Sequence, residues 1–558
     1  MLQCGLCGGL GLVPTNEEEE AVVSPPQQQP RVASVSLADM PCVCQSDDGN
    51  QPTVGAFASE AFSLTEAELL AASSSQRLRI NAVPCISLNA PVKVGDTVAL
   101  LPANDESLPE RLSVAVVGGG IGGLALALAL QQRGVSVGVF ERDESFFERA
   151  QGYGLTLQQG SSAVRALGLA ADAKDAGCFS TSHICLDSGG NLLGRHGAAT
   201  RGEETSAEEA AEVGRRRRNL HLPRQSLRAL LYARLRPGTV RWGCQLDGIE
   251  TNAAAADNDD DAEEKDADGH NHPIKLRFND AGKRRVLADV IVGADGIHSK
   301  MRSVLWQNSR DPHELRPLGV MVLLGYARCS HALCESGDTV FELVDGQSRL
   351  YAMPFTPPPE PTTMWQLSFP IESDEALSLQ RAGGAALLEE AMRRCGDWAE
   401  PLPQLLRATS AADVTGYPVY DREVNNGPFT PRTGGLTGAT LIGDAAHPMA
   451  PFKGQGANQA LLDAVALARA LYDSKLGDEA AAANAALASE AERAVRRPRR
   501  RRRLSVAEAL AAFEAETARR AAVKVAASRA STELLHSEAA MAPVTESLTR
   551  AAAARLAS

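Results

Sequence analysis

The sequence predicts an α/β protein with two sheets and a helical C-terminal region, and three observations support this prediction. From Leu112 the chain runs strand, glycine turn, helix, strand, which is typical of a parallel sheet covered by helices. Further apolar strand-like segments recur between residues 240 and 442, and several follow one another closely, as in an antiparallel sheet. Residues 504–558 read as helix with few breakers.

Composition narrows the class of protein. The 558 residues include 56 Lys and Arg against 69 Asp and Glu, a net charge of −13, with 44% hydrophobic and 22% charged residues. This ordinary globular composition excludes collagen-like, coiled-coil and wholly disordered chains. The acidic balance argues against a general nucleic-acid binder, because a phosphate-binding surface makes a domain basic. Eleven thinly spread cysteines exclude a small disulfide scaffold and indicate reduced thiols.

The first 110 residues differ from the rest of the chain. Residues 1–62 are rich in Pro, Gln, Ser, Asp and Glu, which predicts a disordered extension. In residues 63–110, SLTEAELLAA has the spacing of a capped helix, and RLRINAVPCISLNAPVKVGDTVALL alternates like two or three short strands. We predict a small accessory β-unit, for which an RNA or protein partner is the weaker alternative. Cys4, Cys7, Cys42 and Cys44 have an unusual spacing for a zinc site, so we assign no metal and expect reduced thiols.

The first motif that carries chemistry follows the strand Val114–Val117. Gly118, Gly120 and Gly123 form a GxGxxG turn that opens a helix, and a second strand ends at Glu141. Gly118 permits the tight turn, Gly120 lets a pyrophosphate approach the backbone, and Gly123 lets the helix pack on the strand. Glu141 lies where a ribose-binding carboxylate belongs. The motif therefore predicts dinucleotide binding but does not separate NAD from FAD.

Two further strands deliver acidic residues into turns. The segment ADVIVGADGIHSKMRSVL leads into Asp295-Gly296, followed by Ser299 and Arg302; alone, it reads as an ordinary turn before a helix. The segment ATLIGDAAHP leads into Gly443-Asp444, and a glycine-rich loop then opens a helix near Gly456–Asn458. Asp444 at a strand end could accept a hydrogen bond from a ribityl hydroxyl, while the loop N–H groups could stabilise negative charge on a cofactor ring.

Low-complexity stretches mark insertions rather than core. Residues 251–273 are acidic and polar, and residues 476–503 form an alanine-rich linker that ends in the arginine run 496–503. This run and the run 215–218 are expected to be solvated, with nuclear import as the alternative. Neither a secretory signal nor a membrane span is apparent, so a cytoplasmic location is expected.

Taken in order, these motifs resemble the FAD-dependent aromatic hydroxylases, the para-hydroxybenzoate hydroxylase family of class A flavoprotein monooxygenases. The family's second motif is matched by Asp295, Gly296, Ser299 and Arg302, and its third from Gly443 to Asn458. The segment LPRQSLRALL matches the family segment in which an arginine contacts the flavin, here Arg224. The resemblance covers roughly residues 112–475 without the acidic insertion.

The resemblance implies a discontinuous, Rossmann-like FAD-binding domain, a mostly antiparallel substrate domain and a C-terminal helical region. NADPH or NADH would be the transient electron donor and molecular oxygen the co-substrate, and a hydroperoxyflavin would hydroxylate a small aromatic or cyclic substrate. The backbone carbonyl of Pro451 would lie near the reacting flavin edge. The implied cofactor-binding residues are Gly118, Gly120, Gly122, Gly123, Glu141, Arg142, Arg224, Asp295, Gly296, Arg302, Gly443, Asp444, Pro451, Gly454, Gln455, Gly456, Ala457 and Asn458.

Domain boundaries and alternatives complete the prediction. We expect the FAD-binding domain in residues 111–174, 215–312 and 430–475, the substrate domain in 175–214 and 313–429, and the helical region in 504–558. No general base is evident; His447 is interpreted as loop structure, and Tyr351, Trp365 and Tyr417 more as core than as substrate contacts. An FAD-dependent reductase or halogenase, or a non-catalytic flavin-binding redox or interaction protein, are the alternative functions.

Overall fold

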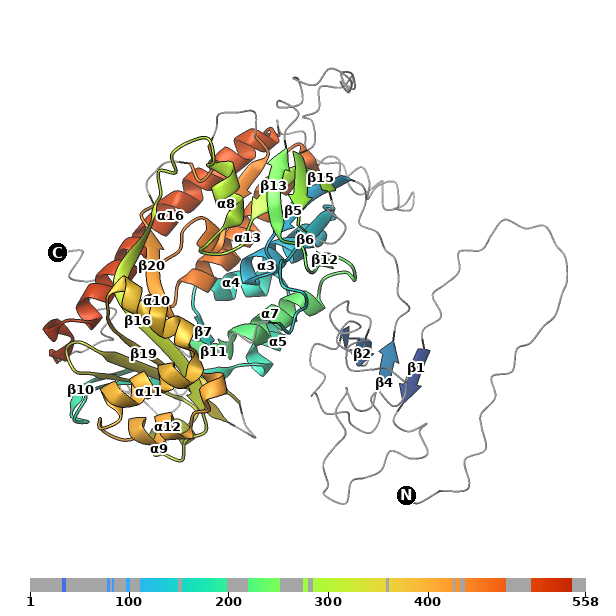
Figure 1. The fold of residues 1–558 in the computed structure, drawn as a ribbon. Coiled ribbons are helices and arrows are strands. Elements are labelled where there is room, and N and C mark those ends of the chain that lie inside the picture. Colours follow the sequence, from blue (N-terminus) through green and yellow to red (C-terminus); the bar gives the residue numbers. More distant parts are fainter. Residues whose placement is uncertain are drawn as a thin grey trace, which may run out of the picture.

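The computed structural model describes thirteen segments of the chain, mostly between residues 111 and 543 (Figure 1). They are residues 33–36, 78–80, 83–84, 97–100, 111–148, 153–197, 219–250, 274–279, 285–357, 361–424, 428–431, 437–477 and 503–543. Cys4, Cys7, Cys42 and Cys44, the acidic insertion, the arginine run 215–218 and the run 496–503 apart from Arg503 lie outside the described residues. In the described part of the chain, no helix has the length and apolar character that crossing a membrane requires.

A seven-stranded mixed sheet forms one half of the structure. Its strand order is β12-β6-β5-β15-β14-β13, with β21 also paired to β15. Pairing is parallel among β12, β6, β5, β15 and β21, and antiparallel from β15 through β14 to β13. The strands are β5 (Arg111–Val117), β6 (Val137–Phe140), β12 (Val240–Arg241), β13 (Leu246–Glu250), β14 (Ile274–Phe278), β15 (Arg285–Gly293) and β21 (Ala439–Leu441).

Helix α3 (Ile121–Gln131) follows β5 and is buried along almost its whole length. Its residues are Gly, Ala, Leu and Ile apart from the final Gln131, which is the composition of a helix packed on both sides. Sheet residues such as Val114 and Val139 pack against it, and so does Leu461 of α13 (Gly456–Tyr472). The predicted βαβ unit of an α/β fold is therefore confirmed.

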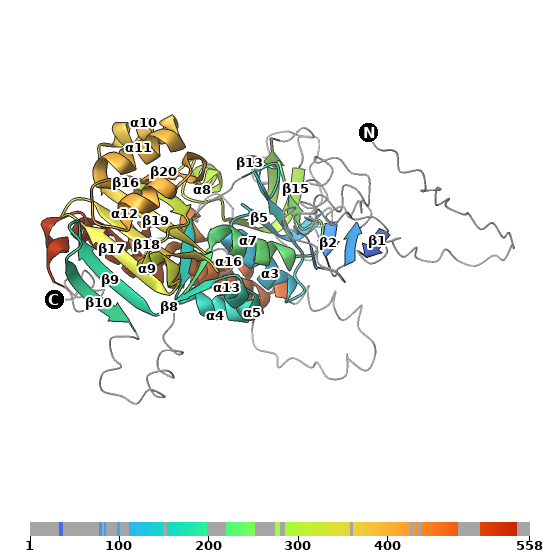
Figure 2. The ribbon, with the colours of Figure 1, turned by 90° about the horizontal axis from the view of Figure 1, so that it is seen from below.

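A second seven-stranded sheet forms the other half, in the order β10-β9-β17-β18-β19-β16-β20. All its pairings are antiparallel except β17 with β9. Helices α10 to α12 cover one face, as Figure 2 shows. The elements are β9 (Ser182–Asp187), β10 (Leu192–Gly197), β16 (Leu315–Ala327), β17 (Thr339–Val344), β18 (Arg349–Thr356), β19 (Thr362–Pro370), β20 (Thr415–Arg422), α10 (Ser373–Ala382), α11 (Gly384–Cys395) and α12 (Leu402–Ala408).

A small three-stranded sheet connects the two halves. Strand β11 (Asn219–Pro223) pairs with β7 (Gly154–Leu157) and β8 (Cys178–Ser180) and runs directly into α7 (Arg224–Ala233). Gly154 packs against Met353 and Phe355 of β18 and Met364 of β19, so the small sheet lies closely on the large one.

Helix α16 (Val506–Leu535) begins at a capping box formed by Ser505 and Glu508 and runs for 30 residues along the outside of both halves (Figure 1). The two sheets and this helix confirm the predicted fold class. The remaining elements are α4 (Gly160–Ala166), α5 (Ala170–Asp175), α8 (Lys300–Leu305), α9 (Ala332–Glu335), η4 (Ala411–Asp413), η5 (Gly443–Ala445), η6 (Pro451–Lys453) and η7 (Glu538–Met541).

Among the described residues before position 111, four short strands are present. They are β1 (Ala33–Ser36), β2 (Leu78–Ile80), β3 (Val83–Pro84) and β4 (Thr97–Leu100), in the order β1-β4-β2-β3. All three pairings are antiparallel. Strand β1 falls in the segment 1–62 and the other three in the segment 63–110.

Candidate active site

Strand register brings the three predicted motifs to one edge of the first sheet. Val117 at the end of β5 is aligned with Gly293 at the end of β15, and Gly293 is aligned with Leu441 at the end of β21. The residues that follow are Gly118, Asp295 and Asp444, while Glu141 follows β6 on the other side of β5. Ligands of open α/β sheets bind outside the carboxyl ends of the parallel strands, so this edge is the candidate site.

The glycine turn after β5 is closely packed at two positions and open at a third. Gly118 has φ +111°, and a Cβ there would lie 2.5 Å from the Ala294 carbonyl oxygen. A Cβ on Gly123 would lie 2.0 Å from the carbonyl oxygen of Gly118. The nearest atom to a Cβ on Gly120 is an Arg224 guanidinium nitrogen at 3.9 Å. The turn therefore leaves room for a ligand in front of Gly120 alone.

The start of α3 is suited to an anion. Its first N–H groups have no acceptor within the helix. The N-cap residue Gly120 provides no side-chain acceptor, and the first turn contains no acidic residue. The positive end of the helix dipole and the Arg224 guanidinium lie together here. Such an arrangement fits a pyrophosphate.

Glu141 is buried and joined to the same turn. Its Oε2 accepts a hydrogen bond of 2.6 Å from the Gly119 N–H, and its Oε1 accepts one of 3.1 Å from the Asp143 N–H. These bonds hold a carboxylate beside the open side of the turn. The neighbouring Arg142 side chain is exposed, and Gly122, on the helix, packs against Ala460 of α13.

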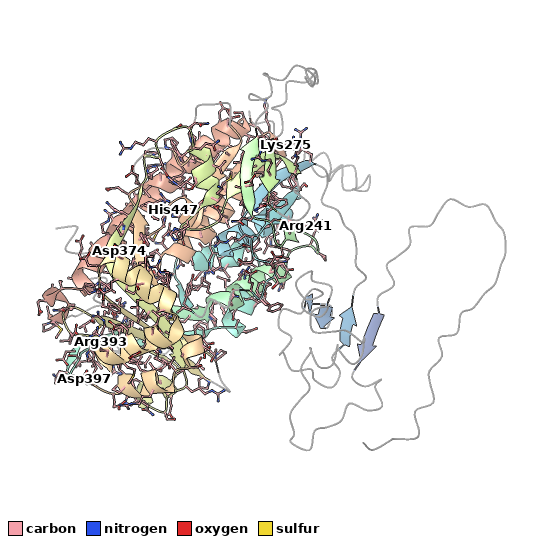
Figure 3. All side chains as sticks on the ribbon, in the orientation of Figure 1. Arg241, Lys275, Asp374, Arg393, Asp397 and His447 are labelled. Atoms are coloured by element: carbon pink, nitrogen blue, oxygen red, sulfur yellow. The ribbon has the colours of Figure 1, made fainter. Side chains whose placement is uncertain are left out.

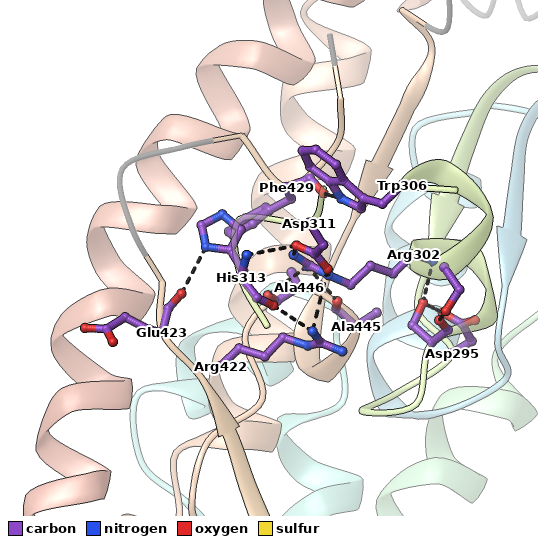
Figure 4. A network of polar contacts seen from close by, with 12 residues as sticks. Asp295, Arg302, Trp306, Asp311, His313, Arg422, Glu423, Phe429, Ala445 and Ala446 are labelled. Atoms are coloured by element: carbon purple, nitrogen blue, oxygen red, sulfur yellow. Dashed lines mark hydrogen bonds and ion pairs between the residues drawn. The ribbon is translucent and has the colours of Figure 1, made fainter. Parts of the chain in front are cut away.

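The second motif, from Asp295 to Arg302, is hydrogen-bonded to the loop that contains Asp444 (Figure 4). Asp295 accepts hydrogen bonds from the Ser299 hydroxyl and the Met301 N–H at 2.6 and 2.9 Å, and Ser299 caps α8. Arg302 is buried and forms a bidentate pair with Asp311, 2.6 Å at each oxygen. It also donates to the carbonyl oxygens of Ala445 and Ala446 at 3.2 and 3.4 Å. Arg302 thus fixes the backbone of the loop that contains Asp444, through the two carbonyl groups that follow Asp444.

The segment Gly443–Gln455, named here the Asp444 loop, is held by a second buried charge. Asp463 of α13 accepts hydrogen bonds from the Gly443 N–H at 2.9 Å and from Nε2 of His447 at 2.7 Å. His447 is fully buried inside the molecule, unlike exposed surface residues such as Arg393 on α11 (Figure 3). The geometry gives His447 the loop-forming role that the sequence indicated.

The Asp444 side chain is exposed to solvent, but many protein atoms lie around it and limit its hydration. Burial raises its pKa, and the Asp463 carboxylate adds to this, while His447 and Arg224 oppose it. An accessible carboxylate in such surroundings can accept hydrogen bonds from a ligand that excludes water. Asp444 is therefore the side chain of the Asp444 loop that is best placed to accept hydrogen bonds from a ligand.

The far end of the Asp444 loop is arranged by Asn458. This buried side chain accepts hydrogen bonds from the N–H groups of Gln158 and Gly160 at 2.9 and 2.8 Å and donates to the carbonyls of Gly454 and Thr156 at 2.7 and 2.9 Å. Gln455 is also buried and donates to the Gln158 side chain at 2.6 Å. Both residues position the loop, and the exposed Gly454 (φ +59°) lies at its surface.

The remaining predicted residues of this region line its accessible side. Pro451 begins η6 and is partly exposed, and Gly456 and Ala457, in the first turn of α13, are partly exposed as well. Gly296 has φ +83°, with open space around the position of a Cβ.

Arg228 is a site residue that sequence reasoning missed. It is buried, its Nε donates to the Gly119 carbonyl at 3.0 Å, and one terminal nitrogen donates to the Phe146 carbonyl at 3.1 Å. Its guanidinium also stacks 4.6 Å from the centre of the Phe146 ring. The signal was present, since Arg228 lies four residues after Arg224 and therefore on the same helix face.

Two tyrosines that pack with the second sheet lie near Arg224 and Asp444. The Arg224 guanidinium lies 5.3 Å from the centre of the Tyr153 ring. Burial raises the pKa of Tyr153 and of Tyr417 on β20, and nearby Asp444 adds to both shifts while Arg224 opposes them. Both side chains are partly accessible, whereas Trp365 is fully buried and donates to the Thr409 hydroxyl at 2.9 Å. Trp365 is core, and Tyr417 faces the site.

Comparison with known proteins decides the family. A family model described as an FAD binding domain matches residues 111–376 and 432–500. The chain belongs to this family. The resemblance to FAD-dependent aromatic hydroxylases is thereby confirmed, and the protein is an FAD-dependent monooxygenase whose family uses NAD(P)H and molecular oxygen.

Curated relatives of this flavoprotein are monooxygenases. The chain is 29% identical over 370 residues to an aurachin C monooxygenase/isomerase of Stigmatella aurantiaca, covering 64% of this chain and 80% of the relative. It is 30% identical over 362 residues to the 3-amino-4-hydroxybenzoate 2-monooxygenase PtnB3 of Streptomyces platensis, covering 64% and 79%.

Solved structures share the fold of this flavoprotein. Klebsiella pneumoniae HpxO complexed with FAD and uric acid matches with a TM-score of 0.56 and 20% identity, over 79% of this chain and 92% of that one. Pseudomonas aeruginosa PqsL, a probable FAD-dependent monooxygenase, matches with a TM-score of 0.54 and 23% identity, over 77% and 98%. At these identities the comparison supports the fold.

Proposed function

We propose that the chain holds FAD along the carboxyl edge of the first sheet and hydroxylates a small ring-bearing substrate beside Tyr153 and Tyr417. The observation that carries this proposal is the shared register of β5, β15 and β21, which places the glycine turn and the Asp444 loop at one edge. FAD, when bound there, supplies the redox chemistry, taking electrons from NADPH or NADH and activating molecular oxygen.

The residues of the edge fit the parts of FAD. The open space before Gly120 and the uncapped start of α3 suit the pyrophosphate, with Arg224 offsetting its charge. Glu141 suits the ribose hydroxyls, since its carboxylate already lies beside the turn. The Asp444 carboxylate suits a ribityl hydroxyl of FAD. The backbone of the partly exposed Pro451, Gly456 and Ala457 suits the polar edge of the ring system.

The substrate side favours a flat, ring-bearing compound. Tyr153 and Tyr417 pack against an apolar cluster that includes Met353, Phe355 and Met364. Aromatic and apolar side chains bind rings by stacking and contact area, and Arg224 beside Tyr153 can face a polar substituent of such a ring. The relatives also bear names of ring compounds, such as 3-amino-4-hydroxybenzoate for PtnB3 and uric acid in the HpxO complex.

A flavin spectrum and a coupling assay test this function. We expect the purified protein to retain FAD or to take it up on reconstitution. We also expect oxidation of NADPH or NADH to be stimulated by one or more phenols or heteroaromatic acids, with little release of hydrogen peroxide. Failure to bind FAD would refute the assignment of the site. Oxidation that no ring compound changes would favour the reductase or scaffold alternative, and halogenated product would favour a halogenase.

A further inference from the structure

The C-terminal helix α16 contacts both halves of the molecule at charged or polar positions. Glu514 accepts hydrogen bonds from the hydroxyls of Thr440 on β21 and Thr430, at 2.9 and 3.1 Å. Farther along, His536, which follows the helix, bonds to the Ser368 hydroxyl on β19 at 2.9 Å. The helix lies after residue 500, where the match to the FAD binding domain ends. Nothing in the family match therefore assigns it a role.

A third contact of α16, made by Arg520, is linked to the Asp444 loop through Asp463. Arg520 of α16 donates to Oδ1 of Asp463, and the other oxygen of Asp463 accepts from Gly443 and His447. The Asp463 side chain is completely buried, whereas that of Arg520 is 24% exposed. A buried carboxylate is costly unless it is paired and hydrogen-bonded. Arg520 supplies the permanent positive charge of this group.

We propose that Arg520 is a positioning residue for the flavin end of the site, which keeps the Asp444 loop in its binding geometry at every working pH by balancing Asp463. This inference rests on the proposed binding of FAD at the Asp444 loop. Arg520 acts through Asp463 and touches neither the turn nor Asp444.

The other partner of Asp463 explains why a positive charge that persists at alkaline pH is required at position 520. His447 is the other cation that faces Asp463, and the carboxylates of Asp463 and Asp444 raise its pKa against the effect of burial. Arg224 on α7 is a further positive charge near these carboxylates, and it acts on Asp444. An imidazole loses its proton as the pH rises, whereas a guanidinium does not. Without Arg520, the charge balance of Asp463 would depend on pH.

The sign of this dependence follows from the direction of the shift. His447 has a raised pKa in the folded protein, so the stability that its charge contributes is present at low pH and is lost as the pH rises through that pKa. Removal of Arg520 raises the pKa of His447 further, because a neighbouring positive charge is lost. Arg520→Gln should therefore bind FAD well at acidic pH and progressively worse at alkaline pH.

Arg529 offers a matched control on the same helix. Its side chain is also 24% exposed, and it pairs at 2.9 Å with Asp421, which is completely buried as well. Asp421 keeps a second cation, Arg316 at 2.6 Å, and lies on β20 rather than beside the Asp444 loop. Arg529→Gln thus removes an equivalent surface-facing charge without leaving a carboxylate near the flavin end uncompensated.

The test is the dissociation constant of FAD for the full-length apoprotein, followed by flavin fluorescence from about pH 6 to about pH 9. We expect Arg520→Gln to weaken binding about tenfold or more at the alkaline end and much less at the acidic end. Arg520→Lys should restore most of the affinity, and Arg529→Gln should leave the pH profile of the wild type. Equal profiles for wild type and Arg520→Gln, or equal losses in the two glutamine variants, would overturn the proposal.

A second pair of variants covers failure of Arg520→Gln to fold. In an Asp463→Asn background the charge that Arg520 balances is absent, so adding Arg520→Gln should change FAD affinity less than about twofold. A loss there as large as in the wild-type background would overturn the proposal. Thermal unfolding of the apoproteins over the same pH range reads the charge balance without FAD. Absence of FAD binding in the wild type would instead refute the proposed function, which keeps the two failures distinct.

Discussion

The substitution Gly120→Ala separates the stability of the fold from its affinity for FAD. Gly120 has an ordinary backbone conformation, φ −76° and ψ −177°, and the position of a Cβ has no neighbour closer than 3.9 Å. A methyl group therefore costs the folded apoprotein almost nothing. Reduced freedom of the unfolded chain would even stabilise the protein, by about 0.4–1 kcal/mol. The same methyl group occupies the space in front of α3 where the pyrophosphate is proposed to bind.

The expected loss of affinity follows from the contacts that the methyl group prevents. A pyrophosphate pushed away from the start of α3 loses one or two hydrogen bonds from N–H groups to charged oxygens, each worth about 1.5–3 kcal/mol. A total of about 1.5–6 kcal/mol corresponds to a dissociation constant raised at least about tenfold and up to about 25,000-fold. Arg224 lies 3.9 Å from the new methyl carbon. Movement of its side chain would not free the space that the methyl group occupies, so it does not restore the lost hydrogen bonds.

Gly123→Ala gives the opposite pattern and serves as the comparison. Its Cβ would lie 2.0 Å from the Gly118 carbonyl oxygen, so α3 or the turn must shift to accept it. We expect this variant to lose about 1–3 kcal/mol of folding stability, as for overpacked cores. The assays are denaturant unfolding of the apoproteins and FAD titration. A Gly120→Ala variant that binds FAD as tightly as the wild type would refute the placement of the pyrophosphate.

Four further outcomes are expected. Glu141→Ala and Asp444→Ala should each weaken FAD retention, measured as flavin per protein after gel filtration; normal occupancy in either variant would contradict the assigned role of that residue. Deletion of residues 1–110 should leave FAD bound, because the first sheet begins with β5 at Arg111, and a colourless truncated protein would show otherwise. Burial, with help from His183, lowers the pKa of His221 to about 4, so the folded protein binds fewer protons than the unfolded chain below an ordinary pKa of 6.5. Stability should then fall by up to about 3 kcal/mol between about pH 6.5 and pH 4, and a His221→Gln variant whose unfolding shows the same slope there would exclude this cause.

Local patterns in the sequence were sufficient to find the edge of the sheet. The glycine turn at Gly118, the acid at Glu141 and the strand ending before Asp444 each carry a signal within about twenty residues, because turn chemistry and strand ends are local. Parallel pairing then requires that such strand ends meet. The register of β5, β15 and β21 agrees with that reasoning.

Contacts between distant segments left no such signal. Arg520 lies 57 residues after Asp463, on a helix whose sequence resembles any alanine-rich helix, and no local rule pairs the two. The pairing of Arg302 with Asp311 was closer in sequence but depends on the turn after α8, which composition does not fix. Trp365 and Tyr417 show the same limit, since both are aromatic residues in strands and only packing separates core from site.

The charged residues behind the site have a common task, which is to hold backbone groups in place. Arg302, which the family resemblance implied as a cofactor-binding residue, is one of them. Arg228 holds the Gly119 carbonyl, Arg302 holds the carbonyls of Ala445 and Ala446, and Asp463 holds the Gly443 N–H. Each is buried and bonds to backbone groups of the turn or the loop in addition to its side-chain partners. A turn fixed in this way presents its remaining N–H groups to a ligand without reorganising, which is how preorganised polar sites gain affinity. A family motif records both kinds of residue, those that face the ligand and those that hold the backbone facing it, and only the contacts of the folded chain separate the two.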